Sequence, residues 1–87
     1  MRASFVMCYY VYILFSESRN RYYVGQTFDL ENRIREHNAG ETKSLKAGRP
    51  WILVWSCKLN SRADAMKIEK QIKARGATRF LIDNKIL

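Results

Sequence analysis

The chain has 87 residues, enough for one compact domain with a modest core and too few for two. Sixteen lysines and arginines against eight acidic residues give a formal net charge of +8, and residues 43–79 hold ten of the basic residues and only two of the acidic ones. This one-sided charge favours a polyanion as partner, with nucleic acid ahead of an acidic membrane surface. The alternative is that the charge serves only solubility.

Cysteine positions and hydropathy further limit the kinds of protein that this chain can be. Cys8 and Cys57 each lie in an apolar run, which favours buried reduced thiols in a cytoplasmic protein, with a disulfide between two strands as the alternative. No Cys-x-x-Cys or paired histidine spacing predicts a zinc site. The apolar run Phe5 to Phe15 superficially resembles a signal peptide, but three tyrosines interrupt it and no small-residue cleavage site follows. No segment is long enough to span a bilayer.

The first part of the chain predicts a β-hairpin. Residues Met7 to Phe15 are rich in aromatic and β-branched side chains without clean alternation, which is typical of a central strand covered on both faces. After a polar loop, Ser16 to Asn20, residues Arg21 to Gln26 predict a second, antiparallel strand. Gly25 stands near its end, where we expect a close approach of the backbone or a special dihedral angle.

A helix over Leu30 to about Asn38, with Asp29 as its N-cap, follows the hairpin. Its apolar stripe runs through Ile34. His37 falls on that stripe, and Arg33 lies at its edge one turn earlier. We therefore expect both side chains to face the sheet rather than bulk water.

The second half of the chain predicts a loop, a strand and two helices. Glu41 to Pro50 has the composition of a basic loop, and Trp51 to Lys58 that of a strand that is apolar throughout. Ser61 is expected to cap a helix that runs to Arg75, and Thr78 to Leu87 predicts a last short helix. The expected fold class is α+β in the order ββαβαα, as a single domain over residues 1–87.

Glu69 is the one residue of the later helix whose position invites two interpretations. It lies at the margin of the apolar stripe and is the only glutamate after Glu41. It is either a solvated salt-bridge partner or a carboxylate directed into a polar pocket. The stripe is formed by Ala65, Ile68 and Ile72, and the neighbouring cations are Lys67, Lys70 and Lys73.

Together these residues resemble the GIY-YIG nuclease domain, and most of all its small stand-alone bacterial members. The likeness rests on the order of several short motifs and covers nearly the whole chain. The family's three-stranded antiparallel sheet flanked by helices agrees with the pattern ββαβαα. The motifs are Tyr10-Val11-Tyr12, Tyr23-Val24-Gly25, Asp29-Leu30, Arg33, His37-Asn38, Gly48-Arg49-Pro50-Trp51 and the helix residues 62–73. Gln26 departs from the pattern, since some relatives carry a lysine there.

The resemblance implies hydrolysis of a phosphodiester with one divalent ion, Mg²⁺ or Mn²⁺. By match to the motifs, Tyr23 would activate the attacking water or take its proton, and Tyr12 would support Tyr23 by hydrogen bonding. Arg33 would neutralise charge on the scissile phosphate, and His37 would orient or relay the proton. Glu69 would hold the metal.

The chemistry independently asks for these residue types. The transition state of a phosphodiester concentrates negative charge on oxygen, which a guanidinium and a metal stabilise. Magnesium keeps several waters, so one glutamate can suffice, and no cluster of acids suggests a second metal. The alternatives are structural: Tyr12 and Tyr23 as core aromatics, Arg33 paired with Glu36 or Asp29, and His37 as a satisfied interior imidazole.

The expected function is that of a cytoplasmic, metal-dependent DNA endonuclease in repair or in processing of branched or damaged DNA. Lys43, Lys46 and Arg49 in the basic loop, with Lys73, are expected to contact phosphates, as in non-specific binders. Specificity would come from DNA shape, a partner protein or a homodimer. The main alternative is a module that binds nucleic acid with a vestigial active site, and RNA is a further possible target.

Overall fold

The computed structural model describes residues 8–87. Three strands and three α-helices follow one another in the predicted order, and a short 3₁₀ helix, η1, precedes the third strand. The elements are β1 (Tyr9–Ser16), β2 (Arg21–Thr27), α1 (Leu30–Asn38), η1 (Lys43–Gly48), β3 (Trp51–Leu59), α2 (Arg62–Arg75) and α3 (Ala77–Asp83). The predicted α+β class and the order ββαβαα are confirmed.

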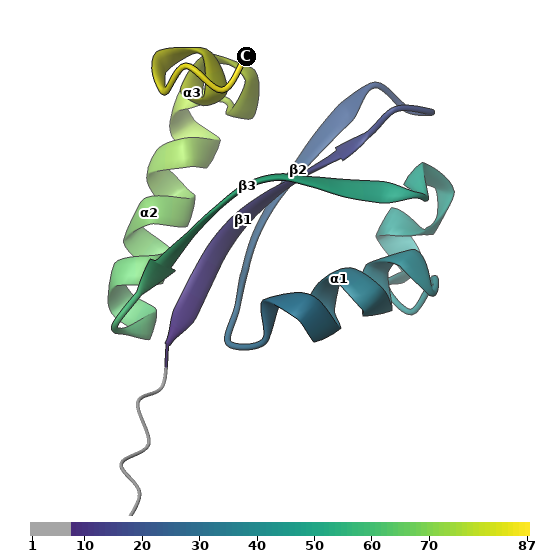
Figure 1. The fold of residues 1–87 in the computed structure, drawn as a ribbon, viewed down its shortest axis with the longest axis horizontal. Coiled ribbons are helices and arrows are strands. Elements are labelled where there is room, and N and C mark those ends of the chain that lie inside the picture. The colour runs from purple at the N-terminus through teal and green to yellow at the C-terminus, as the bar shows by residue number, and fades with distance from the viewer. Residues whose placement is uncertain (1–7) are drawn as a thin grey trace, which may run out of the picture.

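The strands form one antiparallel sheet in the order β2-β1-β3 (Figure 1). The central position predicted for β1 is confirmed, because this strand pairs on both sides. In the β1–β2 ladder Tyr12 lies opposite Gly25, and Leu14 lies opposite Tyr23. The register therefore brings the two tyrosines of the motifs to the same region of the sheet.

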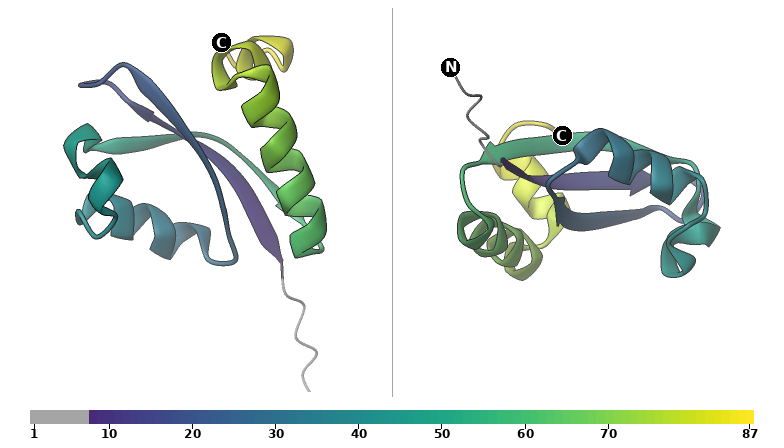
Figure 2. Two further views of the ribbon diagram at one scale, coloured as in Figure 1. Left: turned by 180° about the vertical axis from the view of Figure 1, so that it is seen from behind. Right: turned by 90° about the horizontal axis from the view of Figure 1, so that it is seen from below.

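Helices cover the two faces of the sheet separately, as Figure 2 shows from behind and from below. Alternate residues of each strand point to opposite faces, so each face has its own core. On one face, α2 and α3 pack on a core of Val11, Ile13, Val24, Ala65, Ile72 and Leu81. On the other, α1 and η1 pack on Tyr12, Leu14, Leu45 and Trp51, with Tyr23, Leu30 and Ile34 at the margin.

The predicted helix boundaries are confirmed for α1 and α2. The side chain of Asp29 accepts a hydrogen bond from the backbone N–H of Asn32, and that of Ser61 accepts one from Asp64. Gly76 has φ of +95° at the end of α2, a conformation that glycine adopts at little cost. Both helices that carry predicted site residues are thus fixed in position by local capping.

Several predicted boundaries need correction. The loop predicted over Glu41 to Pro50 contains η1. Leu45, a residue of η1, is buried and anchors this short helix. The last helix ends at Asp83 rather than Leu87. The first strand begins at Tyr9; Met7, where its start was predicted, lies outside the described residues.

β3 is partly exposed although its sequence is apolar throughout. It is an outer strand, and Ile52 and Leu53 remain 53% and 40% exposed. Cys8 and Cys57 are free and half-buried, so the alternative of a disulfide between them is not realised. In the part of the chain that the structure describes, no helix combines the length and the apolar character that crossing a bilayer demands.

Candidate active site

The hydroxyl of Tyr12 is held by a buried histidine. Its oxygen lies 3.1 Å from Nε2 of His37, which α1 delivers to the same face of the sheet. The other ring nitrogen of His37, Nδ1, lies 2.9 Å from Oγ1 of Thr42. Tyr12 and His37 are each 1% exposed, so the inward orientation predicted for His37 is confirmed. Thr42, which sequence reasoning missed, completes a chain of three polar side chains.

Burial fixes the protonation states of this pair. Burial raises the pKa of the Tyr12 phenol well above its ordinary range; the nearby Tyr23 also raises it, whereas the charge of Arg33 lowers it and that of Glu69 raises it. Burial also lowers the pKa of His37, and the Arg33 guanidinium lowers it further. At neutral pH Tyr12 is therefore a neutral phenol and His37 a neutral imidazole with one donating and one accepting nitrogen.

The β2 residue opposite Tyr12 is Gly25, and this position leaves no room for a side chain. A Cβ atom at Gly25 would lie 2.6 Å from the hydroxyl oxygen of Tyr12 and 2.9 Å from a ring carbon of Tyr23. Both separations are closer than ordinary van der Waals contact. The Tyr12 hydroxyl thus occupies the space above the glycine of the second motif. The close approach predicted at Gly25 is therefore confirmed.

Tyr23 stands beside this pair on β2. Its ring centroid lies 6.1 Å from that of Tyr12 and 5.4 Å from that of His37, edge-on to the imidazole. Tyr23 is half-buried, and it lines a hollow formed with η1 and the turn of the hairpin. The two motif tyrosines therefore converge, but only Tyr23 borders a surface hollow.

Arg33 lies at the edge of α1 with 41% of its side chain exposed, so the prediction that it faces the sheet rather than bulk water is wrong for this residue. Its Nε atom is 3.3 Å from a carboxylate oxygen of Glu36, which was one of the two partners predicted as alternatives. An exposed ion pair of this kind contributes little to stability. Among residues 8–87 the terminal amino groups of Arg33 form no hydrogen bond, so they remain available to a ligand.

Glu69 belongs to α2 and therefore to the layer on the opposite face from Tyr12. Its carboxylate nevertheless reaches the edge of β2, where Oε1 accepts a hydrogen bond of 2.9 Å from the amide of Gln26. Oε2 accepts one of 2.6 Å from the ammonium of Lys73. Glu69 is thus a salt-bridge partner, one of the two predicted interpretations, and with 18% of its side chain exposed it also borders an open hollow that Gln26 and Met66 line with it.

Gln26 is where the two layers meet. It lines one hollow with Arg33 and Arg62, and another with Glu69 and Lys73. Its strand position one residue after Gly25 points its side chain to the α2 face of the sheet, on the outer strand β2. Sequence reasoning noted only its departure from the family pattern, although its alternation with Val24 was a signal that it faces α2.

The donor set around Glu69 is suited to a hard divalent ion. A single carboxylate suits Mg²⁺ or Mn²⁺ that retains waters and substrate oxygens, whereas Gln26 turns its amide nitrogen, a donor, toward Glu69 and supplies no ligand in this arrangement. Among residues 8–87, no group of three histidine, cysteine or acidic side chains is placed to hold a metal. Glu69 is the residue that would hold the ion, after displacing Lys73 from Oε2.

The residues predicted to bind nucleic acid lie on two elements. Lys43 and Lys46 are exposed on η1, and Lys73 is exposed on α2. Arg49 is also exposed, but its Nε donates to the carbonyl of Lys46, and its guanidinium lies against Gly40. The four cations therefore do not form one cluster, since η1 and α2 cover opposite faces of the sheet.

Asn38 connects α1 to β3 next to the site. Its side-chain amide donates to the carbonyl of Trp51 and accepts from the N–H of the same residue, at 3.0 and 2.6 Å. This pair of bonds ties the end of α1 to the start of β3. Asn38 therefore holds more than the helix end that the sequence suggested, and it keeps His37 fixed against the sheet.

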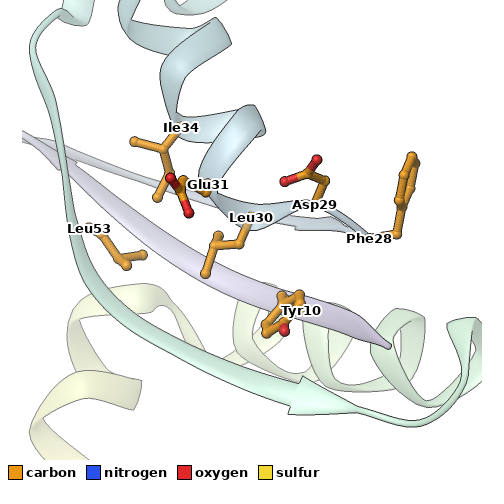
Figure 3. Close-up of a pocket in the computed structure, with 7 residues that line it drawn as sticks. All are labelled: Tyr10, Phe28, Asp29, Leu30, Glu31, Ile34 and Leu53. Atoms are coloured by element: carbon orange, nitrogen blue, oxygen red, sulfur yellow. The ribbon is translucent and has the colours of Figure 1, made fainter. Parts of the chain in front are cut away.

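A separate groove lies between α1 and the start of β1, as Figure 3 shows. Tyr10, Leu30, Ile34 and Leu53 form its walls, and none of the predicted catalytic residues lines it. The carboxylates of Asp29 and Glu31 lie at its rim. Because acidic groups repel phosphate, this groove is a poor candidate for the site of phosphodiester chemistry.

Comparison with known proteins connects this geometry with a family. The family model described as the GIY-YIG catalytic domain matches residues 8–80. The chain belongs to the GIY-YIG family. The matched range includes the two motif tyrosines, Gly25 and the helix residues Arg33, His37 and Glu69.

Relatives of this GIY-YIG domain include small proteins named UPF0213. One from Vibrio campbellii is 41% identical over 61 residues, which are 69% of this chain and 59% of the relative. One from Staphylococcus haemolyticus is 41% identical over 66 residues, 75% of this chain and 79% of the relative. The chain thus spans less than two thirds of the length of the Vibrio relative.

A solved structure shares the fold. The solution NMR structure of a UPF0213 protein from Bacillus halodurans has a TM-score of 0.56 at 32% identity, covering 91% of this chain and 86% of that one. The name UPF0213 states no activity. The comparisons therefore establish a GIY-YIG domain, from a family of nucleases that act on nucleic acids.

Proposed function

We propose that this GIY-YIG domain is an endonuclease that hydrolyses DNA phosphodiester bonds with the help of one divalent ion at Glu69. The observation that carries the proposal is the position of Gln26 at the edge of β2. Gln26 shares a hollow with Arg33 from α1 and is bonded to Glu69 from α2. A guanidinium and a metal-binding carboxylate thus flank one edge of the strand that carries Tyr23.

The division of labour between the two tyrosines follows from their surroundings. Tyr12 is buried and its pKa is raised, so it stays protonated and can only hold and orient its neighbours. Tyr23 is half-buried and borders a surface hollow, so it is the phenol that a bound water can reach. We assign Tyr23 as the group that orients the attacking water, and its phenolate form is the one that can accept the proton of that water.

Arg33 is placed to stabilise the charge that develops during attack. As the water oxygen bonds to phosphorus and the bond to the leaving oxygen breaks, negative charge grows on the phosphoryl oxygens. The free amino groups of Arg33 would donate to those oxygens. His37 does not reach the surface, so its role is to position Tyr12 through the bond at Nε2.

The divalent ion, when bound, would polarise the phosphate and stabilise the leaving oxygen. Gln26 keeps one oxygen of Glu69 in place by its hydrogen bond, while the other oxygen is paired only with an exposed lysine. Lys73, once released from Glu69, becomes free to contact a phosphate. We place the activity in the cytoplasm, in repair or processing of DNA, with DNA shape or a partner as the source of specificity.

A nicking assay on supercoiled plasmid tests the proposal. We expect nicking with Mg²⁺ or Mn²⁺ and none with EDTA, and we expect Tyr23→Phe, Arg33→Ala and Glu69→Gln to abolish it. Each variant has a matched control that makes the same change outside the site: Tyr10→Phe, Arg35→Ala and Glu31→Gln. Tyr10 and Glu31 line the separate groove of Figure 3, and Arg35 is exposed on α1 and lines neither the hollow beside Tyr23 nor those beside Gln26.

The outcome also distinguishes a nuclease from the main alternative, a module that only binds nucleic acid. Retained nicking in Glu69→Gln contradicts the metal assignment, and equal losses in the site variants and their controls contradict the assignment of the site. DNA binding without nicking under every metal condition would leave a binding module with a vestigial active site. Repeating the assay on an RNA of the same sequence distinguishes the two nucleic acids.

A further inference from the structure

The hollow that Tyr23 borders continues from this residue toward the turn of the β1–β2 hairpin, away from Gln26. It has a volume of about 180 Å³ and opens between the turn of the β1–β2 hairpin and η1. Arg19 and Arg21 line it from the hairpin, and Ser44 and Gly48 line it from η1. At about 30 Å³ for each water molecule, the hollow has room for a phosphate group and some of its hydration.

The charge of this hollow is uniformly positive. None of the described residues that line it is acidic, unlike the groove of Figure 3. Arg19 and Arg21 are both exposed, and among residues 8–87 neither forms an ion pair with a carboxylate. Their guanidinium groups are therefore available, and guanidinium is the side chain best matched to phosphate oxygens.

The glycine in η1 keeps the floor of the hollow close to the sheet. A Cβ atom on Gly48 would collide with a ring carbon of Trp51, so no side chain fits there. The indole of Trp51 is fixed in turn by donating from Nε1 to the carbonyl of Leu45. The shape of the hollow is therefore set by buried packing, and the arginines provide its charge.

β2 sets the distance from this hollow to the proposed scissile site. Arg21 and Tyr23 are two residues apart and so lie on the same face, about 7 Å apart along the strand. This is close to the separation of successive phosphates along an extended nucleic-acid strand. Gln26, which holds Glu69, lies farther along in the same direction. Because Gln26 faces α2 while Tyr23 and Arg21 face α1, a nucleic-acid strand would pass Glu69, Tyr23 and Arg21 in that order only by following the free edge of β2.

We propose that the hollow lined by Arg19 and Arg21 binds a backbone phosphate neighbouring the scissile one. The inference rests on the proposed function, because one nucleic-acid strand is taken to contact both the scissile site and this hollow. It adds two residues to the interface that the charge distribution of the sequence did not indicate, because the basic excess lies in residues 43–79. In this arrangement the hairpin, rather than the helices, sets the path of the strand.

Inorganic phosphate tests the hollow without any nucleic acid. In a ¹H–¹⁵N NMR titration we expect the amide signals of Tyr23, Ser44 and Gly48 to shift in a saturable way. The double variant Arg19→Gln/Arg21→Gln should lose these shifts, and Arg79→Gln should keep them, since α3 lies on the opposite face of the sheet. Shifts only at the lysines of α2, or equal shifts in the double variant, would overturn the proposal.

Binding of a fluorescent 20-base-pair DNA duplex in EDTA, where no cutting occurs, provides the second test. The slope of log affinity against log salt should fall by about 0.9 for each arginine replaced in the hollow that contacts a phosphate. Arg79→Gln, which removes one charge as Arg19→Gln or Arg21→Gln alone does, should leave the slope nearly unchanged. Equal slopes in the hollow and control variants would refute the hollow, whereas a reduced slope in a protein that never nicks would refute only the nuclease proposal.

Discussion

Replacing Gly25 by alanine tests whether the Tyr12 hydroxyl occupies the space above this glycine. The new Cβ atom would lie 2.6 Å from the hydroxyl oxygen of Tyr12 and 2.8 Å from the ring carbon that carries it. Ordinary contacts are about 3.5–4.0 Å, so the ring must shift by most of an ångström. That ring is buried, and its hydroxyl is bonded to His37, so the shift also strains this bond.

The expected cost is about 1–3 kcal/mol of the free energy of unfolding, the usual range for overpacking a core. An alanine in a strand would otherwise stabilise the fold slightly, because glycine has the larger unfolded-state entropy. Urea unfolding followed by tryptophan fluorescence measures the effect. For a chain of this size, with a slope of about 1 kcal/mol per molar urea, the midpoint should fall by about 1–3 M.

A double-mutant cycle identifies the cause. Tyr12→Phe removes the hydroxyl that the Cβ atom would meet first, and by itself it costs about 1–3 kcal/mol because His37 loses a buried partner. In the double variant Gly25→Ala/Tyr12→Phe the two losses overlap, so the total should be at least about 0.5 kcal/mol smaller than the sum. Strict additivity, or a Gly25→Ala variant as stable as the wild type, would refute the reasoning.

Two further predictions concern charge. Burial and Arg33 lower the pKa of His37 in the folded protein, so the unfolded chain binds more protons below about pH 6.5. The free energy of unfolding should therefore fall as the pH drops from 7.5 to 5.5. His37→Gln should lose most of this fall, and an unchanged pH dependence in that variant would contradict the account. Lys73 competes with the metal for Glu69, so Lys73→Gln should bind Mn²⁺ about two- to fivefold more tightly than Lys70→Gln, measured by electron paramagnetic resonance of the free ion. Lys70 lines the same hollow without bonding Glu69, so equal affinities in the two variants would show a general effect of charge.

The sequence predicted the parts of the fold that depend on local signals. Asp29 and Ser61 are N-caps because their side chains can accept from the free N–H groups of a first helical turn, and no tertiary information is needed to recognise that. The placement of His37 on the inward stripe of α1 followed from helical periodicity in the same way. The convergence of Tyr12 and Tyr23 followed from the pairing of adjacent strands.

Contacts between distant segments were less predictable. The bond from Gln26 to Glu69 joins residues 43 apart and depends on how α2 packs against the edge of β2. The hollow beside Tyr23 depends on η1, which the composition of Glu41 to Pro50 did not distinguish from a loop. The apolar sequence of β3 predicted a strand, but the outer place of that strand in the sheet is set by topology, which local hydrophobicity does not encode.

The central claim is that side chains from both faces of the sheet form one metal-binding site at the edge of β2. Adding substoichiometric Mn²⁺ to ¹⁵N-labelled protein tests it most directly, because the amide signals nearest the ion broaden first. We predict that the signals of Gly25, Gln26 and Glu69 broaden first, and that Glu69→Gln prevents this. If broadening instead begins at Asp29 and Glu31, at the rim of the acidic groove, the metal site is elsewhere and the account is wrong.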